Sequence, residues 1–262
     1  MHSSTVKDGK LKSMFSSMFL EKYTRGEFVE RRRRKIYGFA LCARGNANQK
    51  NLIFAIKCSI IALGGENMIK TIEMLRSELT QFNNPDAKVK RMVNAGELIP
   101  VIRGLYETDG SVPGHYLSAS IYGPSYLSFE FALGYHSLIP EEVHNFTCAT
   151  FEKKKKKQYV TPFGVFTYRD VPRRAYPADV LLVFENNYSF QVATAEKAIC
   201  DMLYKTCPLR NLKGIREYLF EDLRIEEEDF FNLDLNKMQE ISQLYDTKNH
   251  RLLDSLVKKK KV

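Results

Sequence analysis

The sequence predicts a protein of the α+β class, and three observations lead to that prediction. Apolar residues recur at helical spacing between residues 68 and 95, strand-like runs with turn signals occupy residues 143–192, and helical spacing dominates again after Pro208. A chain of 262 residues with 44% hydrophobic residues is long enough for one large or two ordinary domains. We therefore expect a helical start, a middle region with β-hairpins, and a helical C-terminus.

The first 67 residues carry nearly all of the net charge of +9. They hold 13 Lys and Arg against 5 Asp and Glu, whereas the rest of the chain holds 27 against 26. Residues 1–50 lack sustained periodicity and contain the basic run Arg31–Lys35. We interpret residues 1–67 as a basic extension, disordered or derived from translated upstream sequence, with Met68 as the natural start. The alternative is a basic arm that binds nucleic acid.

Two helices and a small hairpin are predicted between Met68 and Thr108. The first helix has one apolar face, formed by Ile69, Ile72, Leu75 and Leu79. The second begins with a cap at Asn84, has Pro85 at its first position, and ends before Gly96. Strands at 98–102 and 105–106 then flank a turn, which is the shape of a wing.

Four basic residues of this segment would contact DNA phosphates: Lys88, Lys90, Arg91 and Arg103. A complete winged domain needs three helices before the wing, and the sequence provides room for two. Residues 68–123 also hold six basic and six acidic side chains, so no basic platform is evident. The alternative is therefore a solvated helix face that does not bind DNA. A Gly/Pro/Ser-rich connection, 110–123, ends this domain, which gives the expected division into 68–123 and 124–262.

The segment 124–140 reads PSYLSFEFALGYHSLIP and predicts a buried amphipathic helix. Ser128 is the expected N-cap, and Glu130 lies in the first turn, where the helix dipole favours a carboxylate. The apolar face contains Phe129, Ala132, Leu133 and His136. We interpret His136 as a core histidine with its hydrogen bonds satisfied rather than as a ligand.

Five consecutive lysines lie between predicted strands at 143–150 and 160–168, the second broken by a turn at 162–164. They are Lys153, Lys154, Lys155, Lys156 and Lys157. Like charges in a row repel each other and favour solvent, so we expect them at a hairpin tip. Two interpretations stay open: a basic finger for nucleic acid or an acidic partner, and a solvated loop.

A second hairpin and a helix are predicted at 181–205. Asn186-Asn187 is a two-residue turn signal between strands at 181–185 and 188–192. The helix 193–205 reads ATAEKAICDMLYK, with Thr194 as its cap and Glu196 in its first turn. Lys197 and Asp201 form an i,i+4 pair that we expect on the helix surface. Further helices are predicted at 236–245 and 250–256.

Sequence motifs for catalysis and cofactor binding are missing: there is no P-loop, GxGxxG, HExxH or GxSxG. The five cysteines show no metal-ligand spacing, and their odd number excludes a complete intrachain disulfide framework, which favours a reducing cytoplasmic compartment. The apolar run 52–63 is too short to span a bilayer. We predict no catalytic residues, no metal, no cofactor and no membrane association.

The segments 124–140 and 193–205 resemble two hallmark segments of the AbiEi-type antitoxins of type IV toxin–antitoxin systems, which act in abortive infection. In the second segment the family reads A-T-x-E-K-A-L-x-D-x-L-Y, and this chain has Ile199 where leucine is usual. Residues 87–108 also resemble the end of the family's winged domain. The resemblance covers residues 68–262, and it implies a structural or partner-binding role for Ser128, Glu130, Glu196, Lys197, Asp201 and Tyr204.

The resemblance implies a small winged-helix-like domain followed by a larger mixed α/β antitoxin domain. It implies an antitoxin, not an enzyme, that counters a nucleotidyltransferase-like toxin without needing a stable complex with it. It also implies repression of its own operon through operator DNA. With about three or four phosphate contacts per protomer a monomer would bind weakly, so we expect a dimer on an inverted repeat. Two alternatives remain: an interaction protein whose antitoxin-like body does not bind DNA, and an enzyme whose site is assembled only by the fold.

Overall fold

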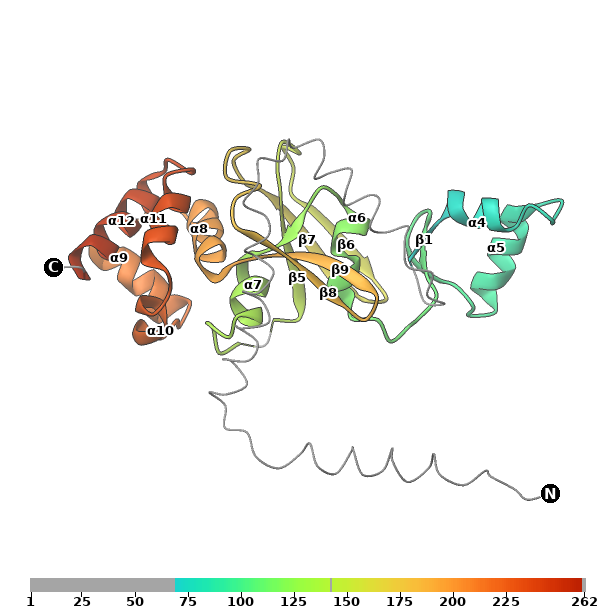
Figure 1. Cartoon of the computed structure of the whole chain (residues 1–262), viewed down its shortest axis with the longest axis horizontal. Coiled ribbons are helices and arrows are strands. Elements are labelled where there is room, and N and C mark those ends of the chain that lie inside the picture. The colour runs from blue at the N-terminus through green and yellow to red at the C-terminus, as the bar shows by residue number, and fades with distance from the viewer. Residues whose placement is uncertain (1–68, 142, 261–262) are drawn as a thin grey trace, which may run out of the picture. The chain divides into compact units, whose positions relative to one another are not determined.

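The computed structural model describes residues 69–141 and 143–260 (Figure 1), and this part of the chain is a mixed α+β protein, as the sequence predicts. The basic segment 1–67, with both of its interpretations, lies outside the described residues. Among the helices that are described, none has both the length and the apolar character needed to cross a membrane.

The first part of the described chain combines two helices with a three-stranded antiparallel sheet of order β1-β3-β2. Its elements are β1 (Lys70–Thr71), α4 (Ile72–Glu78), α5 (Pro85–Asn94), β2 (Ile99–Ile102) and β3 (Leu105–Glu107). They enclose a small core of Leu75, Leu79, Val89 and Leu98. The hairpin β2–β3 lies where the sequence predicts a hairpin, and Gly104 in its turn has a φ of 81°, a conformation that glycine adopts without strain.

The start of this region differs from the prediction at one point. We expected Ile69 to lie in the first helix, but Lys70 and Thr71 pair with β3, and the helix begins at Ile72. Thr71 caps it by accepting a 3.3 Å hydrogen bond from the Met74 amide. The predicted cap of α5 is confirmed, because Asn84 Oδ1 accepts a 3.0 Å bond from the Ala87 amide.

A mixed six-stranded sheet of order β6-β7-β5-β4-β9-β8 forms the centre of the larger region (Figure 1). Its strands are β4 (Tyr126–Leu127), β5 (Asn145–Thr150), β6 (Lys157–Thr161), β7 (Gly164–Asp170), β8 (Val180–Glu185) and β9 (Tyr188–Ala193). The pairs β5–β7 and β4–β9 are parallel, and the other neighbours are antiparallel.

The parallel pairing of β5 with β7 shows that the expected place of the lysine run was wrong. We expected a hairpin between strands 143–150 and 160–168, with the lysines at its tip. Instead, residues 157–161 form a separate strand at the sheet edge, and its hairpin with β7 turns at residues 162–163. The lysines therefore lie mainly in the connection that carries the chain from β5 past β7 to the edge strand β6. Lys157 is the first residue of β6.

The second hairpin agrees with its prediction. β8 and β9 pair antiparallel up to Glu185 and Tyr188, which leaves Asn186 and Asn187 as the turn. Their φ angles are 49° and 65°, and the type I′ turn requires positive φ at both central residues. Asparagine tolerates this conformation better than most residues, which explains the sequence at this position.

The connection 110–123 contains two short helices, η2 (Gly114–Leu117) and α6 (Ser118–Ile121), that pack on the sheet. The Tyr116 ring stacks on Phe190 of β9, with centroids 5.4 Å apart. The Tyr168 hydroxyl of β7 donates a 2.6 Å hydrogen bond to the Ser118 carbonyl. Much of this Gly/Pro/Ser-rich stretch is therefore part of the larger region's core.

Helices pack beside the sheet and form the C-terminal part (Figure 1). They are α7 (Phe129–Tyr135), α8 (Ala195–Lys205), α9 (Leu212–Arg216), the π-helical η3 (Glu217–Asp222), α10 (Glu227–Phe231), α11 (Leu235–Ser242) and α12 (Lys248–Lys260). Helix α8 contacts α7 on one side and α11 and α12 on the other. The two predicted C-terminal helices are confirmed as α11 and α12, with boundaries shifted by a few residues.

Candidate functional site

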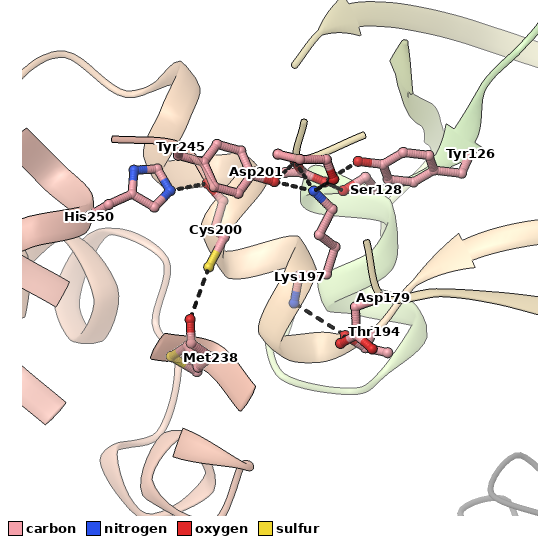
Figure 2. A network of polar contacts seen from close by, with 11 residues as sticks. Tyr126, Ser128, Asp179, Thr194, Lys197, Cys200, Asp201, Met238, Tyr245 and His250 are labelled. Atoms are coloured by element: carbon pink, nitrogen blue, oxygen red, sulfur yellow. Dashed lines mark hydrogen bonds and ion pairs between the residues drawn. The ribbon is translucent and has the colours of Figure 1, made fainter. Parts of the chain in front are cut away.

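Helix α8 carries the second family-like segment into the interior. Thr194 caps the helix, since its hydroxyl accepts a 3.2 Å bond from the Lys197 amide and donates a 2.6 Å bond to Asp179 Oδ2 (Figure 2). Every residue from Ala195 to Leu203 is buried, including the charged ones. A helix that is enclosed on all sides has no solvent-facing stripe, so its charged residues need partners inside the protein.

Lys197 and Asp201 form an ion pair of 3.2 Å in which both side chains are 0% exposed. The predicted i,i+4 pairing is confirmed, but its predicted place on the helix surface is wrong. The reason is the packing of α7, α11 and α12 around α8, which periodicity within one helix cannot reveal. Burial removes the hydration of both charges, so the pair is stable only if further hydrogen bonds replace that hydration.

Three hydroxyl groups and one carbonyl supply those hydrogen bonds (Figure 2). Asp201 accepts from the Tyr126 hydroxyl at 3.0 Å, from the Ser128 hydroxyl at 2.6 Å, and from the Tyr245 hydroxyl. Lys197 Nζ donates to the Ala175 carbonyl at 2.8 Å and contacts the Tyr245 hydroxyl. We call Tyr126, Ser128, Lys197, Asp201 and Tyr245 the buried network.

Ser128 has a different role from the one predicted. It stands at the N-cap position of α7, but its side chain makes no capping hydrogen bond. Its hydroxyl donates instead to the carboxylate of Asp201. A hydrogen bond to a charged acceptor is stronger than one to a neutral acceptor. The backbone at this helix start is unusual as well, since Phe129 has a φ of 56°.

The buried network keeps its tyrosines protonated. Burial, followed by the negative charge of Asp201, raises the pKa of Tyr126 and of Tyr245 well above the usual value. Both phenols therefore remain protonated hydrogen-bond donors near neutral pH. Because the pair of charges is fully buried and saturated with partners, its role is to hold β4, α7, α8 and the segment after α11 together.

The remaining motif residues also connect elements. Glu196 is 6% exposed, and its Oε1 accepts a 3.1 Å hydrogen bond from the Asp234 amide at the start of α11. Glu130 accepts a 2.9 Å bond from Arg169 Nη1 of β7. The centroid of the Tyr204 ring lies 5.7 Å from that of the Tyr245 ring. Every motif residue that we selected thus contacts another part of the fold.

A second cluster is open to solvent. It surrounds a concavity of about 430 Å³ that we call the basic hollow, lined by Lys154, Lys155, Lys156, Arg169, Asp170 and Lys205. The three lysines come from the β5–β6 connection, Arg169 and Asp170 end β7, and Lys205 ends α8. Sequence periodicity gives no signal for Arg169, Asp170 or Lys205 at this site, because the parallel pairing of β5 with β7 brings the first two to the loop and the packing of α8 brings Lys205.

The lysine run is divided by the fold. Lys153 is turned away from the basic hollow, since its Nζ lies 5.1 Å from the Tyr122 ring centroid and donates a 3.2 Å hydrogen bond to the Gly123 carbonyl. Lys157 is exposed in β6 opposite Tyr168. Of the five consecutive lysines, Lys154, Lys155 and Lys156 line the concavity.

Asp170 fixes the connection that carries these lysines. Its Oδ1 accepts a 2.6 Å hydrogen bond from the Thr150 hydroxyl, and its Oδ2 accepts a 2.5 Å bond from the Lys154 amide. Lys154 has a φ of 61°, a conformation that costs a non-glycine residue on the order of 1 kcal/mol and that this amide hydrogen bond helps to hold. The only carboxylate of the basic hollow is therefore engaged in shaping its loop.

The residues predicted to contact DNA lie on α5 and in the wing. Lys90, Arg91 and Arg103 are exposed, whereas Lys88 is half-buried, with its Nζ 5.6 Å from the Phe82 ring centroid. Lys88 and Arg91 share one side of α5, and Lys90 points about 100° away from Arg91 around the helix. The three basic residues of α5 therefore do not form a single basic face.

His136, which we interpreted as a core histidine, is half-buried, and its Nε2 lies 2.7 Å from the Ala193 carbonyl oxygen. Within 69–141 and 143–260, no group of three or more His, Cys, Asp and Glu residues is arranged to hold a metal ion.

Comparison with protein-family models gives no match, and comparison with curated proteins gives none.

Proposed function

We propose that this chain is an antitoxin-like protein of a type IV toxin–antitoxin system, acting in the cytoplasm and in phage defence. Its functional partner would be a nucleotidyltransferase-like toxin, countered without a stable complex. One observation carries this proposal. The two segments that resemble AbiEi antitoxins, 124–140 and 193–205, meet in the buried network, where Ser128 Oγ lies 2.6 Å from Asp201 Oδ2.

This contact supports the resemblance because it joins the two segments directly inside the protein. Two short sequence matches far apart in a chain can arise by chance. Residues that match at both places and also bind each other inside the protein form a single structural unit. Lys197, Asp201 and Ser128 belong to that unit, and Glu196 and Tyr204 extend it toward α11 and Tyr245.

The arrangement of α4, α5 and the β2–β3 hairpin supports an abbreviated winged-helix-like domain, which would bind operator DNA as a dimer. Helix α5 followed directly by a hairpin places Arg103 in the turn of the wing. Phosphate contacts from Lys88, Lys90, Arg91 and Arg103 would give an affinity that falls steeply with salt.

The second candidate is an interaction protein with the same body that does not bind DNA. Two observations favour it: the described chain has two helices before the wing, and the basic residues of α5 point in different directions. The enzyme alternative is weaker at the buried network, because fully buried charges offer no access to a substrate.

Growth of cells that express a nucleotidyltransferase-like toxin from the neighbouring gene tests the main proposal. We expect co-expression of the full chain to restore growth. A variant with Lys154, Lys155 and Lys156 changed to Gln tests the basic hollow, and Lys157→Gln is its matched control from the same run. Persistent toxicity with soluble wild-type chain at high level would reject the antitoxin proposal.

A further inference from the structure

The basic hollow is lined by more cationic side chains than carboxylates. Five cationic side chains and one carboxylate line it. Within the described chain, none of the ammonium groups of Lys154, Lys155, Lys156 and Lys205 has a carboxylate within ion-pair distance. Asp170 uses both of its oxygens on the Thr150 hydroxyl and the Lys154 amide. Arg169 alone is paired, with Glu130 at 2.9 Å.

Such an arrangement brings like charges together at the protein surface. Like charges that line one concavity repel each other. Partial burial lowers the pKa of Lys205, and the charge of Arg169 lowers it further, although Asp170 and Asp201 act in the opposite direction. A bound anion would relieve this repulsion.

The size and shape of the concavity limit the anion. About 430 Å³ lies within the range of small-molecule sites. The cations come from three separate segments and line one concavity, whereas a nucleic-acid strand needs cations spread along a track. A compact anion with several charges fits better than a long strand does.

We propose that the basic hollow binds a triphosphate group, as carried by a nucleoside triphosphate. A terminal phosphate carries roughly −1.5 to −2 near pH 7, and two further phosphates bring the chain to about −4. The four ammonium groups without carboxylate partners match this charge. Lys154, Lys155 and Lys156 would bind the phosphates from the loop, and Lys205 would bind them from the end of α8.

Arg169 and Asp170 would position the site. The Arg169 guanidinium is held against the Phe129 ring at 5.0 Å and by Glu130, so it presents a fixed charge at the wall of the concavity. Asp170 accepts a hydrogen bond from the Lys154 amide, and this bond fixes the backbone at the first of the three lysines. This inference stands on the geometry of the hollow and is independent of the antitoxin proposal.

Isothermal titration of the purified full chain in a phosphate-free buffer tests the proposal. The probes are inorganic triphosphate, ATP, GTP, CTP, UTP, AMP and a single-stranded oligonucleotide. We expect inorganic triphosphate and at least one nucleoside triphosphate to bind with one site per chain, and AMP to bind at least about tenfold more weakly. Tighter binding of a nucleotide than of inorganic triphosphate would show that the base is read as well, and equal binding would show that only phosphate is read.

Two triple variants separate a site from general electrostatic attraction. In the first, Lys154, Lys155 and Lys156 become Gln, and in the second, Lys88→Gln, Lys90→Gln and Arg91→Gln remove the same total charge from α5. We expect the first to weaken triphosphate binding at least about tenfold and the second to change it less than about twofold. Lys205→Gln should weaken it as well.

Three results would overturn the proposal: no binding of any triphosphate, equal losses in both triple variants, or oligonucleotide binding that depends on Lys154, Lys155 and Lys156 while triphosphates do not bind. The last result would assign the hollow to nucleic acid. Because the titration contains no toxin, failure of growth rescue with normal triphosphate binding would reject the antitoxin proposal alone.

Discussion

Ser128 Oγ donates a 2.6 Å hydrogen bond to Oδ2 of Asp201, a residue 73 positions further along the chain, and both side chains are fully buried. The bond joins the start of α7 to the middle of α8. A hydrogen bond to a buried carboxylate contributes more to stability than one between neutral groups. This contact is therefore a sensitive point at which to test the buried network.

Ser128→Ala should lower the free energy of unfolding by roughly 1.5–3 kcal/mol, because the buried carboxylate of Asp201 loses one donor. Urea unfolding at pH 7.5 measures the change. Ser255→Ala is the matched control, since the Ser255 hydroxyl is exposed and donates only to the Arg251 carbonyl of its own helix. A loss at Ser128 no larger than the control's change, within about 0.5 kcal/mol, would show that this bond is dispensable.

Acid should destabilise the protein through His250. This ring is 2% exposed and stacks on Tyr245 with centroids 4.4 Å apart. Its Nε2 lies 3.1 Å from the Cys200 carbonyl and must donate there, so neutral Nδ1 accepts from the Thr247 hydroxyl at 2.7 Å. Burial, together with the charge of Lys197, lowers the pKa of His250 from 6.5 to about 4, although the Cys200 carbonyl acts in the opposite direction.

The sign of the pH effect follows from these values. Between pH 6.5 and about 4 the unfolded chain binds a proton at His250 that the folded protein does not. The free energy of unfolding should therefore fall as the pH drops through this window, by on the order of 3 kcal/mol from this residue, and its contribution should be complete above pH 6.5. Urea unfolding at several pH values measures the slope, which His250→Gln should reduce. The exposed His144→Gln should keep the wild-type slope, and an unchanged slope in His250→Gln would contradict the assignment.

The turn between β8 and β9 should distinguish glycine from β-branched residues. Asn187 has a φ of 65°, which glycine adopts freely and valine does not. Asn187→Gly should leave the free energy of unfolding unchanged or raise it slightly, whereas Asn187→Val should lower it by roughly 1–3 kcal/mol. Thermal unfolding of both variants provides the comparison, and equal melting temperatures would argue against a type I′ turn.

If the first region binds DNA, its affinity should fall with increasing salt concentration in proportion to the number of phosphate contacts. If the full chain binds its own promoter, Arg103→Gln should weaken binding to all sequences alike and reduce the salt slope by about one, because one phosphate contact is lost. Fluorescence anisotropy against promoter and scrambled duplexes measures both quantities. Equal affinity for the two duplexes at low salt would leave the interaction protein without DNA binding as the better proposal.

The sequence was sufficient to predict elements whose signals are local. The Asn84 cap, the hairpin at residues 99–107 and the Asn186-Asn187 hairpin depend on neighbouring residues, and all three are confirmed. The pairing of Lys197 with Asp201 is also local, since the two residues are one helical turn apart. The resemblance implies a structural or partner-binding role for both residues.

Long-range contacts decided what the sequence could not predict. Nothing near Lys153 indicates that β5 pairs in parallel with β7, so the lysine run was placed at a hairpin tip instead of in a crossover connection. The burial of Lys197 depends on helices formed later in the chain. Tyr245 and Lys205 were missed for the same reason, because each joins its site only through tertiary packing.

A double-mutant cycle on Lys197 and Asp201 tests most directly whether this ion pair within 193–205 is the coupled centre of the buried network, to which 124–140 is bonded through Tyr126 and Ser128. We predict that Lys197→Met and Asp201→Asn each lower the free energy of unfolding by roughly 3–5 kcal/mol, since each leaves a buried charge without its partner. The double variant should cost at least about 2 kcal/mol less than the sum of the two. Losses that add within about 0.5 kcal/mol would contradict this, and they would show that hydroxyl and carbonyl groups hold each charge independently of the other.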